Sequence, residues 1–348
     1  MKSEAMSPLQ QPFVSVVTPV YNGEAFLAEC IESVLKQTYE NYEYIIVNNC
    51  STDRTLQIAL EYAKKDSRIR VHNNERFVPV IANHNIAFNL ISSKAKYCKV
   101  VSADDFIFPD CIKRMVELAE ANLSVGLVGS YQLSGDRVRW QGFRYPQAVM
   151  SGVELCRMIF LGGEETSQFG SAFGFGSPTS LLYRADFLRR NSEFYPNESP
   201  HSDTSACFTV LRNSDFGFVY EVLSFERIHP GTQSYASTQI NRFLSANLND
   251  VICYGPFYLN KQELAQQLAA TLKAYHRFLA VNYFCSSREK TFWDYHKERL
   301  AELGYPLKRF ALLKAAVITV LEESVNPGLA LGKLRSRLFS RPLRDRFG

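Results

Sequence analysis

The first third of the chain alternates between strand-like and helix-like segments, and this alternation constrains the fold more than any other feature. Val14–Thr18 is a short β-rich run, and residues 25–37 follow with apolar side chains at the spacing of one helical face. Tyr44–Val47 is a second apolar run, after which Thr52 and Asp53 offer caps for another helix. Repeated strand–helix units predict an α/β fold with a mostly parallel central sheet flanked by helices.

The alternation continues through two further strands. Residues 69–72 and 99–101 are expected to be strands, with a helix over residues 81–91 between them. Pro109 is predicted to be the first residue of a helix that runs through Leu118, because proline is favoured at that position. Ligands of such sheets bind outside the carboxyl ends of the strands, so the polar residues that follow each strand are the first candidates for a site.

Length and composition exclude several classes of protein. With 348 residues, the chain is long enough for two domains, or for one large domain with an appendage. Its 46% hydrophobic and 21% charged residues are typical of a globular protein and exclude a disordered, collagen-like or coiled-coil chain.

Location and cysteine usage follow from what the sequence does not contain. Ala311–Leu321, interrupted by Lys314, is shorter than the roughly 20 apolar residues of a spanning helix. Residues 1–12 contain no apolar stretch of signal-peptide length, so a cytoplasmic location is expected. The 8 cysteines are dispersed without a Cys-x-x-Cys pair, which predicts buried thiols rather than a zinc site or disulfides.

The small positive charge is concentrated at the end of the chain. Residues 331–348 hold six Lys or Arg and one Asp, which is a net charge of +5. Because the whole chain has a net charge of +4, residues 1–330 have a net charge of 4 − 5 = −1. Apolar residues lie between these cations, as in a membrane-surface anchor, although a disordered basic tail is the alternative. The expected anionic partner is therefore a membrane surface rather than nucleic acid.

Adjacent carboxylates follow the strand at 99–101. Asp104 and Asp105 repel each other unless a cation or several hydrogen-bond donors compensate them. Mg²⁺ or Mn²⁺ suits such a pair, because a hard cation binds one or two carboxylates and completes its coordination with substrate phosphates. Alternatively, one aspartate only caps the helix that begins near Pro109.

The order of several motifs resembles that of a known family. Val14–Asn22, Ser33–Tyr39, Ser51–Thr55 and Ala103–Asp105 occur in the order and spacing typical of family 2 glycosyltransferases, and the resemblance covers roughly residues 13 to 235. It implies a GT-A fold with a C-terminal all-helical extension. The expected parts are a flexible N-terminus at 1–12, a nucleotide-sugar-binding half at 13–130, an acceptor-binding half at 131–238, a helical extension at 239–330 and a basic amphipathic tail at 331–348.

The resemblance also implies an activity. It is the inverting, metal-dependent transfer of a sugar from a nucleotide diphosphate-sugar, with a UDP-sugar favoured, to a saccharide or lipid-linked saccharide, as in polysaccharide biosynthesis. Helices after residue 239 are expected to pack on the transferase domain or to form a homodimer. The alternative is a catalytically degenerate nucleotide-sugar-binding module that regulates or recruits other proteins.

Site residues are carried over by position. Asp105 and His229 are predicted to bind the metal, and Asp203 to be the general base, although Asp203 could be only a helix N-cap and His201 could be the base instead. The residues predicted to bind the donor are Thr18, Pro19, Tyr21, Asn49, Asp53, Asn85, Ser102 and Asp104. Contacts to the acceptor or diphosphate are predicted for His84, Phe175, His201 and Arg227.

One segment departs from the family pattern. Asn48-Asn49-Cys50-Ser51 stands where the resemblance leads us to expect Asp-Asp-Gly-Ser, whose second aspartate accepts a hydrogen bond from a pyrimidine base. The Asn49 amide can still accept a hydrogen bond and can also donate, so uracil or thymine remains readable while a different base edge becomes possible. Cys50 in place of glycine predicts a turn that needs no positive φ.

Overall fold

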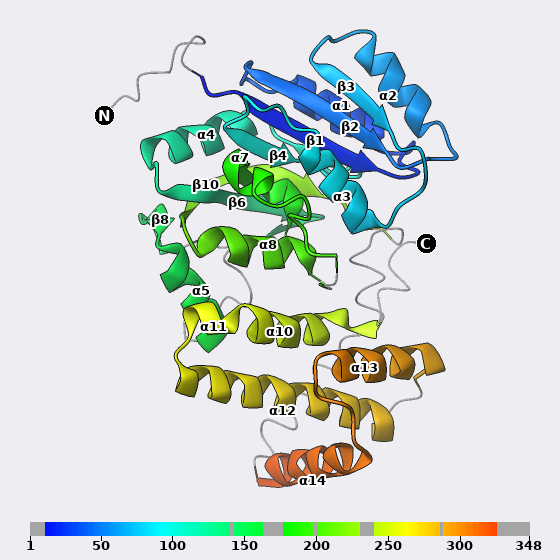
Figure 1. The fold of residues 1–348 in the computed structure, drawn as a ribbon, viewed down its shortest axis with the longest axis vertical. Helices are drawn as coiled ribbons and strands as arrows, with labels where there is room; N and C mark the ends of the chain where they lie inside the picture. The colour runs from blue at the N-terminus through cyan, green and yellow to red at the C-terminus, as the bar shows by residue number, and fades with distance from the viewer. Residues whose placement is uncertain are drawn as a thin grey trace. The chain divides into compact units, whose positions relative to one another are not determined.

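One 10-stranded sheet, whose strands all lie between residues 14 and 226, is the centre of the first part of the chain (Figure 1). A computed structural model describes residues 11–139, 142, 144–162, 177–197, 199, 201–229, 240–285 and 288–325. In chain order, the strands are β1 Val14–Val20, β2 Tyr42–Asn48, β3 Ile69–Asn73, β4 Tyr97–Val100, β5 Phe106–Ile107, β6 Val125–Ser134, β7 Arg137–Arg139, β8 Val149–Met150, β9 Leu181–Arg184 and β10 Asp215–Glu226.

The order across the sheet is β3-β2-β1-β4-β9-β6-β10-β5, with β7 paired to β6 and β8 to β10. The neighbours β3, β2, β1 and β4 are parallel, as are β6 and β10, whereas β9 runs antiparallel to both β4 and β6. The predicted α/β class with a mostly parallel sheet is therefore confirmed.

Helices lie between the strands along the chain, and further helices follow β10. They are α1 Leu27–Leu35, α2 Thr55–Ala63, α3 Val80–Asn89, α4 Cys111–Ala121, α5 Gly152–Leu161, α7 Ala185–Arg189, α8 Ser202–Leu211, α10 Arg242–Cys253, α11 Gly255–Tyr258, α12 Lys261–Cys285, α13 Lys290–Glu302 and α14 Arg309–Val325, with a 3₁₀ turn, η2, at Pro178–Ser180. Fully buried residues of α1, such as Ile31, and of α4, such as Ile112, share one core cluster with Val16 and Ile46 of the central strands. Burial of these faces is the main stabilising contribution, because apolar area leaves water.

Two local predictions are wrong. Pro109 is not the first residue of a helix, because α4 begins at Cys111 with Asp110 at its N-cap. The Pro109 carbonyl instead accepts a hydrogen bond from the Thr38 backbone N–H at 2.9 Å, which holds this residue outside the helix. Cys50 does adopt a positive φ, of 56°, and its Sγ donates to the Asn74 carbonyl at 3.1 Å, which helps to fix this left-handed turn.

The chain forms two compact units. The first comprises residues up to Gln239 together with Asp250–Leu264, and the second comprises Ile240–Asn249 and the residues from Ala265. Within the second unit, the buried His296 ring lies between the Tyr275 hydroxyl, 2.6 Å from Nδ1, and the Ile240 carbonyl, 2.9 Å from Nε2. Burial lowers the pKa of His296 to about 4, so this histidine is a neutral part of the helical core.

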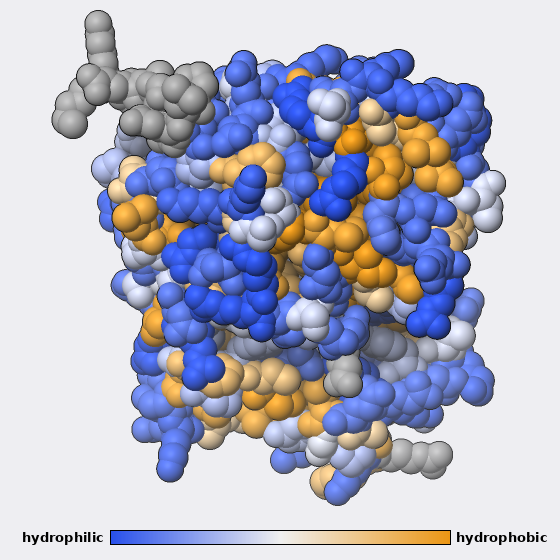
Figure 2. All heavy atoms as spheres, turned by 45° about the horizontal axis from the view of Figure 1, so that its top comes forward, coloured by the Kyte–Doolittle hydropathy of each residue, from blue (hydrophilic) through white to orange (hydrophobic). Residues whose placement is uncertain are grey.

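Surface properties agree only in part with the expectations. Among the described helices, none combines the length and the apolar character needed to cross a membrane. Five of the described cysteines are buried, but Cys253 is exposed, so the prediction of buried thiols is wrong at that residue. Hydrophilic residues cover much of the face drawn in Figure 2, with hydrophobic residues gathered in patches between them. The basic tail at 331–348 lies outside the described residues.

Candidate functional site

The carboxyl ends of β1, β2 and β4 form one edge of the sheet, and most predicted donor residues lie there. Tyr21 follows β1 and is 48% exposed, whereas Thr18 and Pro19 are buried within β1. The Thr18 hydroxyl donates to the Val101 carbonyl at 2.8 Å and lies 2.9 Å from the Tyr44 hydroxyl. The Thr18 side chain therefore stabilises the protein core beneath this edge, and it is not among the proposed donor contacts.

Asp105 is held in place by two segments that are distant in sequence. Its Oδ2 accepts a hydrogen bond from the Thr179 hydroxyl at 2.7 Å, and its Oδ1 accepts one from the Arg227 backbone N–H at 3.0 Å. Burial and then the neighbouring Asp104 carboxylate raise the pKa of Asp105 to about 7. Ser102 joins the same group, since its backbone N–H donates to the Thr179 hydroxyl at 3.1 Å.

Asp104 faces the segment that follows β10. Its Oδ2 lies 3.2 Å from Nε2 of His229, and its backbone carbonyl accepts a hydrogen bond from Nε of Arg227 at 3.0 Å. The Arg227 guanidinium also pairs with Glu29 of α1 at 2.5 Å and lies over the Phe26 ring, 4.6 Å from its centre. Arg227 thus connects α1, the aspartate pair and the end of β10.

The donor set suits a hard divalent cation in its chemistry. Two carboxylates and an imidazole, those of Asp104, Asp105 and His229, lie close together after β4 and β10, and burial followed by the charge of Asp104 raises the pKa of Asp105. In the described part of the chain, no three His, Cys, Asp or Glu side chains already converge as a metal site. Substrate phosphates would have to complete the coordination.

Two further predicted donor residues bind protein groups. Desolvation alone would raise the pKa of Asp53, but the hydrogen bonds that Asp53 accepts from the Thr55 hydroxyl, from the Thr55 N–H at 3.0 Å and from the Glu24 N–H at 3.1 Å outweigh it and lower the pKa. Asn49 is 1% exposed, and its amide is bound to the main chain of Val78. Both residues therefore fix loops at the sheet edge.

Asp203, His201, Tyr195 and His84 form a second cluster, and Asp203 is about 100 residues from the aspartate pair along the chain. It lies in the first turn of α8, whose N-cap is His201, so the alternative that Asp203 is the N-cap is wrong. Its Oδ1 accepts a hydrogen bond from the Thr204 N–H at 2.8 Å. Burial raises the pKa of Asp203 to about 6. The pKa of the buried Tyr195 is also raised, first by its own burial and then by the charge of Asp203.

The other predicted contacts flank this cluster. His84 stacks on Tyr195 with ring centres 5.5 Å apart, while Asn85 donates to the Tyr195 carbonyl at 2.8 Å and accepts from its N–H at 2.9 Å. Burial lowers the pKa of His201 to about 4, which makes His201 a weaker base than Asp203 at neutral pH. Phe175 lies outside the described residues.

Two residues that support Asp105, Thr179 and Lys99, cannot be recognised from the sequence. Thr179 lies in η2, 74 residues from Asp105 along the chain. Lys99 is fully buried in β4, where its Nζ donates to the carbonyls of Thr179 at 2.6 Å and Leu181 at 3.0 Å. Burial lowers the pKa of Lys99. The acceptors of Lys99 are main-chain carbonyls, which every residue type carries. The sequence therefore does not indicate which residues bind this lysine or that its role is structural.

Replacing Thr179 by valine should destabilise the protein by about 1–3 kcal/mol, because Asp105 Oδ2 would lose its hydroxyl donor while staying buried. Urea unfolding at pH 8 measures the change. Thr209→Val, at an exposed residue of α8, is the matched control and should change stability by less than about 0.5 kcal/mol. Equal effects of the two substitutions would contradict a special role of the Thr179 hydroxyl.

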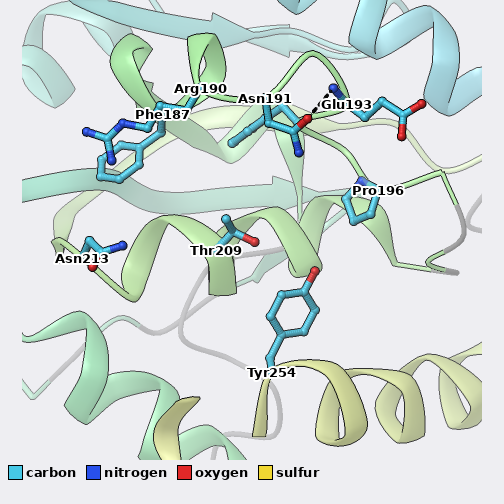
Figure 3. Close-up of a pocket in the computed structure, with 9 residues that line it drawn as sticks. Phe187, Arg190, Asn191, Glu193, Pro196, Thr209, Asn213 and Tyr254 are labelled. Carbon is cyan, nitrogen blue, oxygen red and sulfur yellow. Dashed lines mark hydrogen bonds between the residues drawn. The ribbon is translucent and has the colours of Figure 1, made fainter. Parts of the chain in front are cut away.

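Two cavities lie apart from these clusters. Figure 3 shows one of about 230 Å³, where Tyr254 points from below toward Thr209 of α8, and Asn191 accepts a hydrogen bond from the Glu193 N–H at 3.0 Å. A groove of about 750 Å³ is lined by residues of α4 and β10, including Glu117 and Tyr220. None of the predicted site residues lines either cavity.

The protein is an α/β protein with an aspartate pair at the carboxyl edge of its sheet, the edge where such folds bind ligands, and similarity to known proteins identifies its family. The sequence model of glycosyl transferase family 2 matches residues 15–190, about half of the chain, so the protein belongs to this family. EpsJ of Bacillus subtilis, an uncharacterized glycosyltransferase, is 38% identical over 128 residues, which are 36% of each protein. The chain thus spans little more than a third of the length of the first curated relatives that it matches.

Solved structures share the fold. The crystal structure of S. aureus TarS 1–349 in complex with UDP-GlcNAc matches with a TM-score of 0.61 and 18% identity, over 83% of this chain and 80% of that one. The mannosyltransferase PcManGT from Pyrobaculum calidifontis, in complex with GDP-Man and Mn²⁺, matches with a TM-score of 0.50 and 14% identity, over 92% and 90% of the two chains. These likenesses show that the chain has the GT-A fold.

Proposed function

We propose that the protein transfers a sugar, with inversion, from a nucleotide diphosphate-sugar to a saccharide or lipid-linked saccharide. The observation that carries the proposal is the pair of clusters in one unit: the carboxylates and histidine at the sheet edge, and the partly buried Asp203 in α8. The first cluster suits a diphosphate with a cation, and the second suits the proton of an acceptor hydroxyl.

The residues divide the chemistry between them. Asp203 accepts the proton of the acceptor hydroxyl as the new glycosidic bond forms, and its raised pKa makes the carboxylate a stronger base than an exposed aspartate. Asp104, Asp105 and His229 would hold Mn²⁺ or Mg²⁺, and Thr179 and the Arg227 N–H keep Asp105 in position. The bound cation would neutralise the charge of the departing nucleoside diphosphate.

A UDP-sugar is the favoured donor. The support is the fold shared with TarS, which was solved with UDP-GlcNAc, while the GDP-Man complex of PcManGT demonstrates that another base is used on the same fold. PcManGT was also solved with Mn²⁺, which supports the cation.

UDP release from a panel of UDP-sugars, with saccharide acceptors present, tests the proposal. We expect release with Mn²⁺, loss of release with EDTA and recovery when Mn²⁺ is restored in excess. Binding of the donor without turnover would instead favour the catalytically degenerate module. If no nucleotide diphosphate or nucleotide-sugar binds, the proposed function is wrong.

We also propose a peripheral association with the cytoplasmic face of a membrane. The support is the cationic composition of residues 331–348 and, ahead of them in α14, the exposed apolar side chains of Phe310, Leu313 and Val317. Co-sedimentation with vesicles of phosphatidylglycerol, but not of phosphatidylcholine alone, is the expected result. A homodimer through the C-terminal helices is the other outcome, and it would be detected by light scattering.

A further inference from the structure

A buried amide connects the end of β2 to the segment that follows β3. Asn49 binds the main chain of Val78 twice: its Oδ1 accepts from the Val78 N–H at 3.0 Å, and its Nδ2 donates to the Val78 carbonyl at 2.8 Å. Asn74 donates to the same Oδ1 at 3.0 Å and to the Oδ1 of Asn83 at 2.8 Å. Because Asn49 is 1% exposed, its amide is used inside the protein and is not presented to a ligand.

The residue that this amide positions is Phe77, the neighbour of Val78. The Phe77 ring is 58% exposed and lies edge-on to the ring of Tyr21, with ring centres 4.9 Å apart and an angle of 65° between their planes. Tyr21 follows β1, and Phe77 follows β3, on the two sides of β2. Two exposed rings therefore stand together at the edge of the sheet where the donor is proposed to bind.

We infer that Phe77 is a donor-binding residue, whose ring joins that of Tyr21 in holding the base, and that Asn49 is a positioning residue for Phe77. The family resemblance already implies the donor contact of Tyr21, whereas the roles of Phe77 and Asn49 come from the structure. The inference rests on the proposed function. A base can stack on an aromatic ring whatever its hydrogen-bonding edge, because every base has a π-face. This explains how the site operates although Asn49 stands where the family resemblance leads us to expect an aspartate.

The inference makes opposite predictions from direct base reading at residue 49. In the Asn49→Asp variant, a carboxylate oxygen would replace Nδ2 and face the Val78 carbonyl at the distance of a hydrogen bond, with no proton to share. The segment that carries Phe77 would lose one of its two hydrogen bonds to residue 49 and gain a repulsion at the Val78 carbonyl, so the aspartate should weaken nucleotide binding. If residue 49 read the base as an acceptor, the aspartate should strengthen it.

Calorimetric titration of the full chain with UDP and with pyrophosphate, both in the presence of Mn²⁺, tests the inference. Phe77→Ala should weaken UDP binding about tenfold and leave pyrophosphate binding within about twofold, because only UDP has a base to stack. Phe77→Tyr should restore UDP binding, and Asn49→Asp should weaken it severalfold. Leu123→Ala removes a large side chain that is 70% exposed elsewhere, and it should change neither ligand.

The outcomes separate this inference from the proposed function. If the wild-type chain binds neither UDP nor another nucleoside diphosphate, both are wrong. If the wild-type chain binds UDP and Phe77→Ala binds it equally well, or if Asn49→Asp binds it more tightly, the ring pair does not hold the base and only this inference is overturned. Should Asn49→Asp fail to fold, the two Phe77 variants decide.

Discussion

Asp203→Asn should lower the rate of acceptor-dependent UDP release by roughly 10²–10⁴-fold, the usual contribution of a general base. The amide has nearly the shape of the carboxylate and can still accept the Thr204 N–H, so the start of α8 should stay intact. What the variant loses is the ability to take a proton. UDP binding, which involves the other cluster, should remain within about twofold of the wild type.

The matched control for this variant is Asp186→Asn. Asp186 is also an aspartate in the first turn of a helix, α7, but it pairs with Arg184 and Arg190 at the surface. We expect the control to keep the wild-type turnover number. A turnover number of Asp203→Asn equal to that of the wild type would show that another group is the base, and His201→Ala would then be the next variant to measure.

The pH dependence of the rate provides a second check on Asp203. Because its pKa is raised to about 6, the fraction of ionised Asp203 falls about tenfold for each pH unit below that value. The turnover number of the wild type should fall with it between pH 6 and pH 4.5. At saturating Mn²⁺, where the bound cation would keep Asp105 ionised, the residual activity of Asp203→Asn should lack this dependence.

The same pKa has a consequence for stability. A carboxyl whose pKa is higher in the folded than in the unfolded state binds more protons when folded, so ionisation costs stability as the pH rises from about 4 to above 6. Asp203→Asn should therefore be more stable than the wild type at pH 7.5, by on the order of 1 kcal/mol, and equally stable near pH 4. Urea unfolding at the two pH values measures the difference; a variant less stable at pH 7.5 would contradict the raised pKa.

Asp105→Asn is the second change with a large expected effect. Asp105 is held by the Thr179 hydroxyl and the Arg227 N–H, so its carboxylate is fixed before any ligand binds. An asparagine can accept only one of these bonds through its oxygen, and it contributes no charge to a cation. We expect UDP release to fall at least about 100-fold, with a much weaker response to added Mn²⁺.

Titrating the rate with Mn²⁺ distinguishes loss of the cation from a general loss of structure. Asp66→Asn, after α2 and paired with Arg68, is the control and should respond to Mn²⁺ as the wild type does. An Asp105→Asn variant with the wild-type rate and the wild-type Mn²⁺ response would remove Asp105 from the proposed cation site. Thermal unfolding should show that both variants are folded.

Elements that depend on neighbouring residues can be predicted from the sequence, whereas contacts between distant residues cannot. Strands such as β1 and helices such as α1 were predicted near their observed positions, because the period of apolar residues is a local property. The partners of Asp105 could not be predicted, since Thr179 is 74 residues away and the Arg227 backbone 122. The role of Asn49 was also hidden, because an amide that binds a ligand and one that binds Val78 look the same in a sequence.

Helix α3 contributes to both clusters through residues two positions apart. Asn83 accepts a hydrogen bond from Asn74 in the amide cluster that holds the Phe77 segment, and Asn85 is bound twice to the main chain of Tyr195, beside Asp203. Any shift of α3 on donor binding would therefore move the surroundings of Asp203, the proposed general base. Thermodynamic linkage makes such coupling reciprocal, so an acceptor that tightens donor binding must itself bind more tightly once the donor is present.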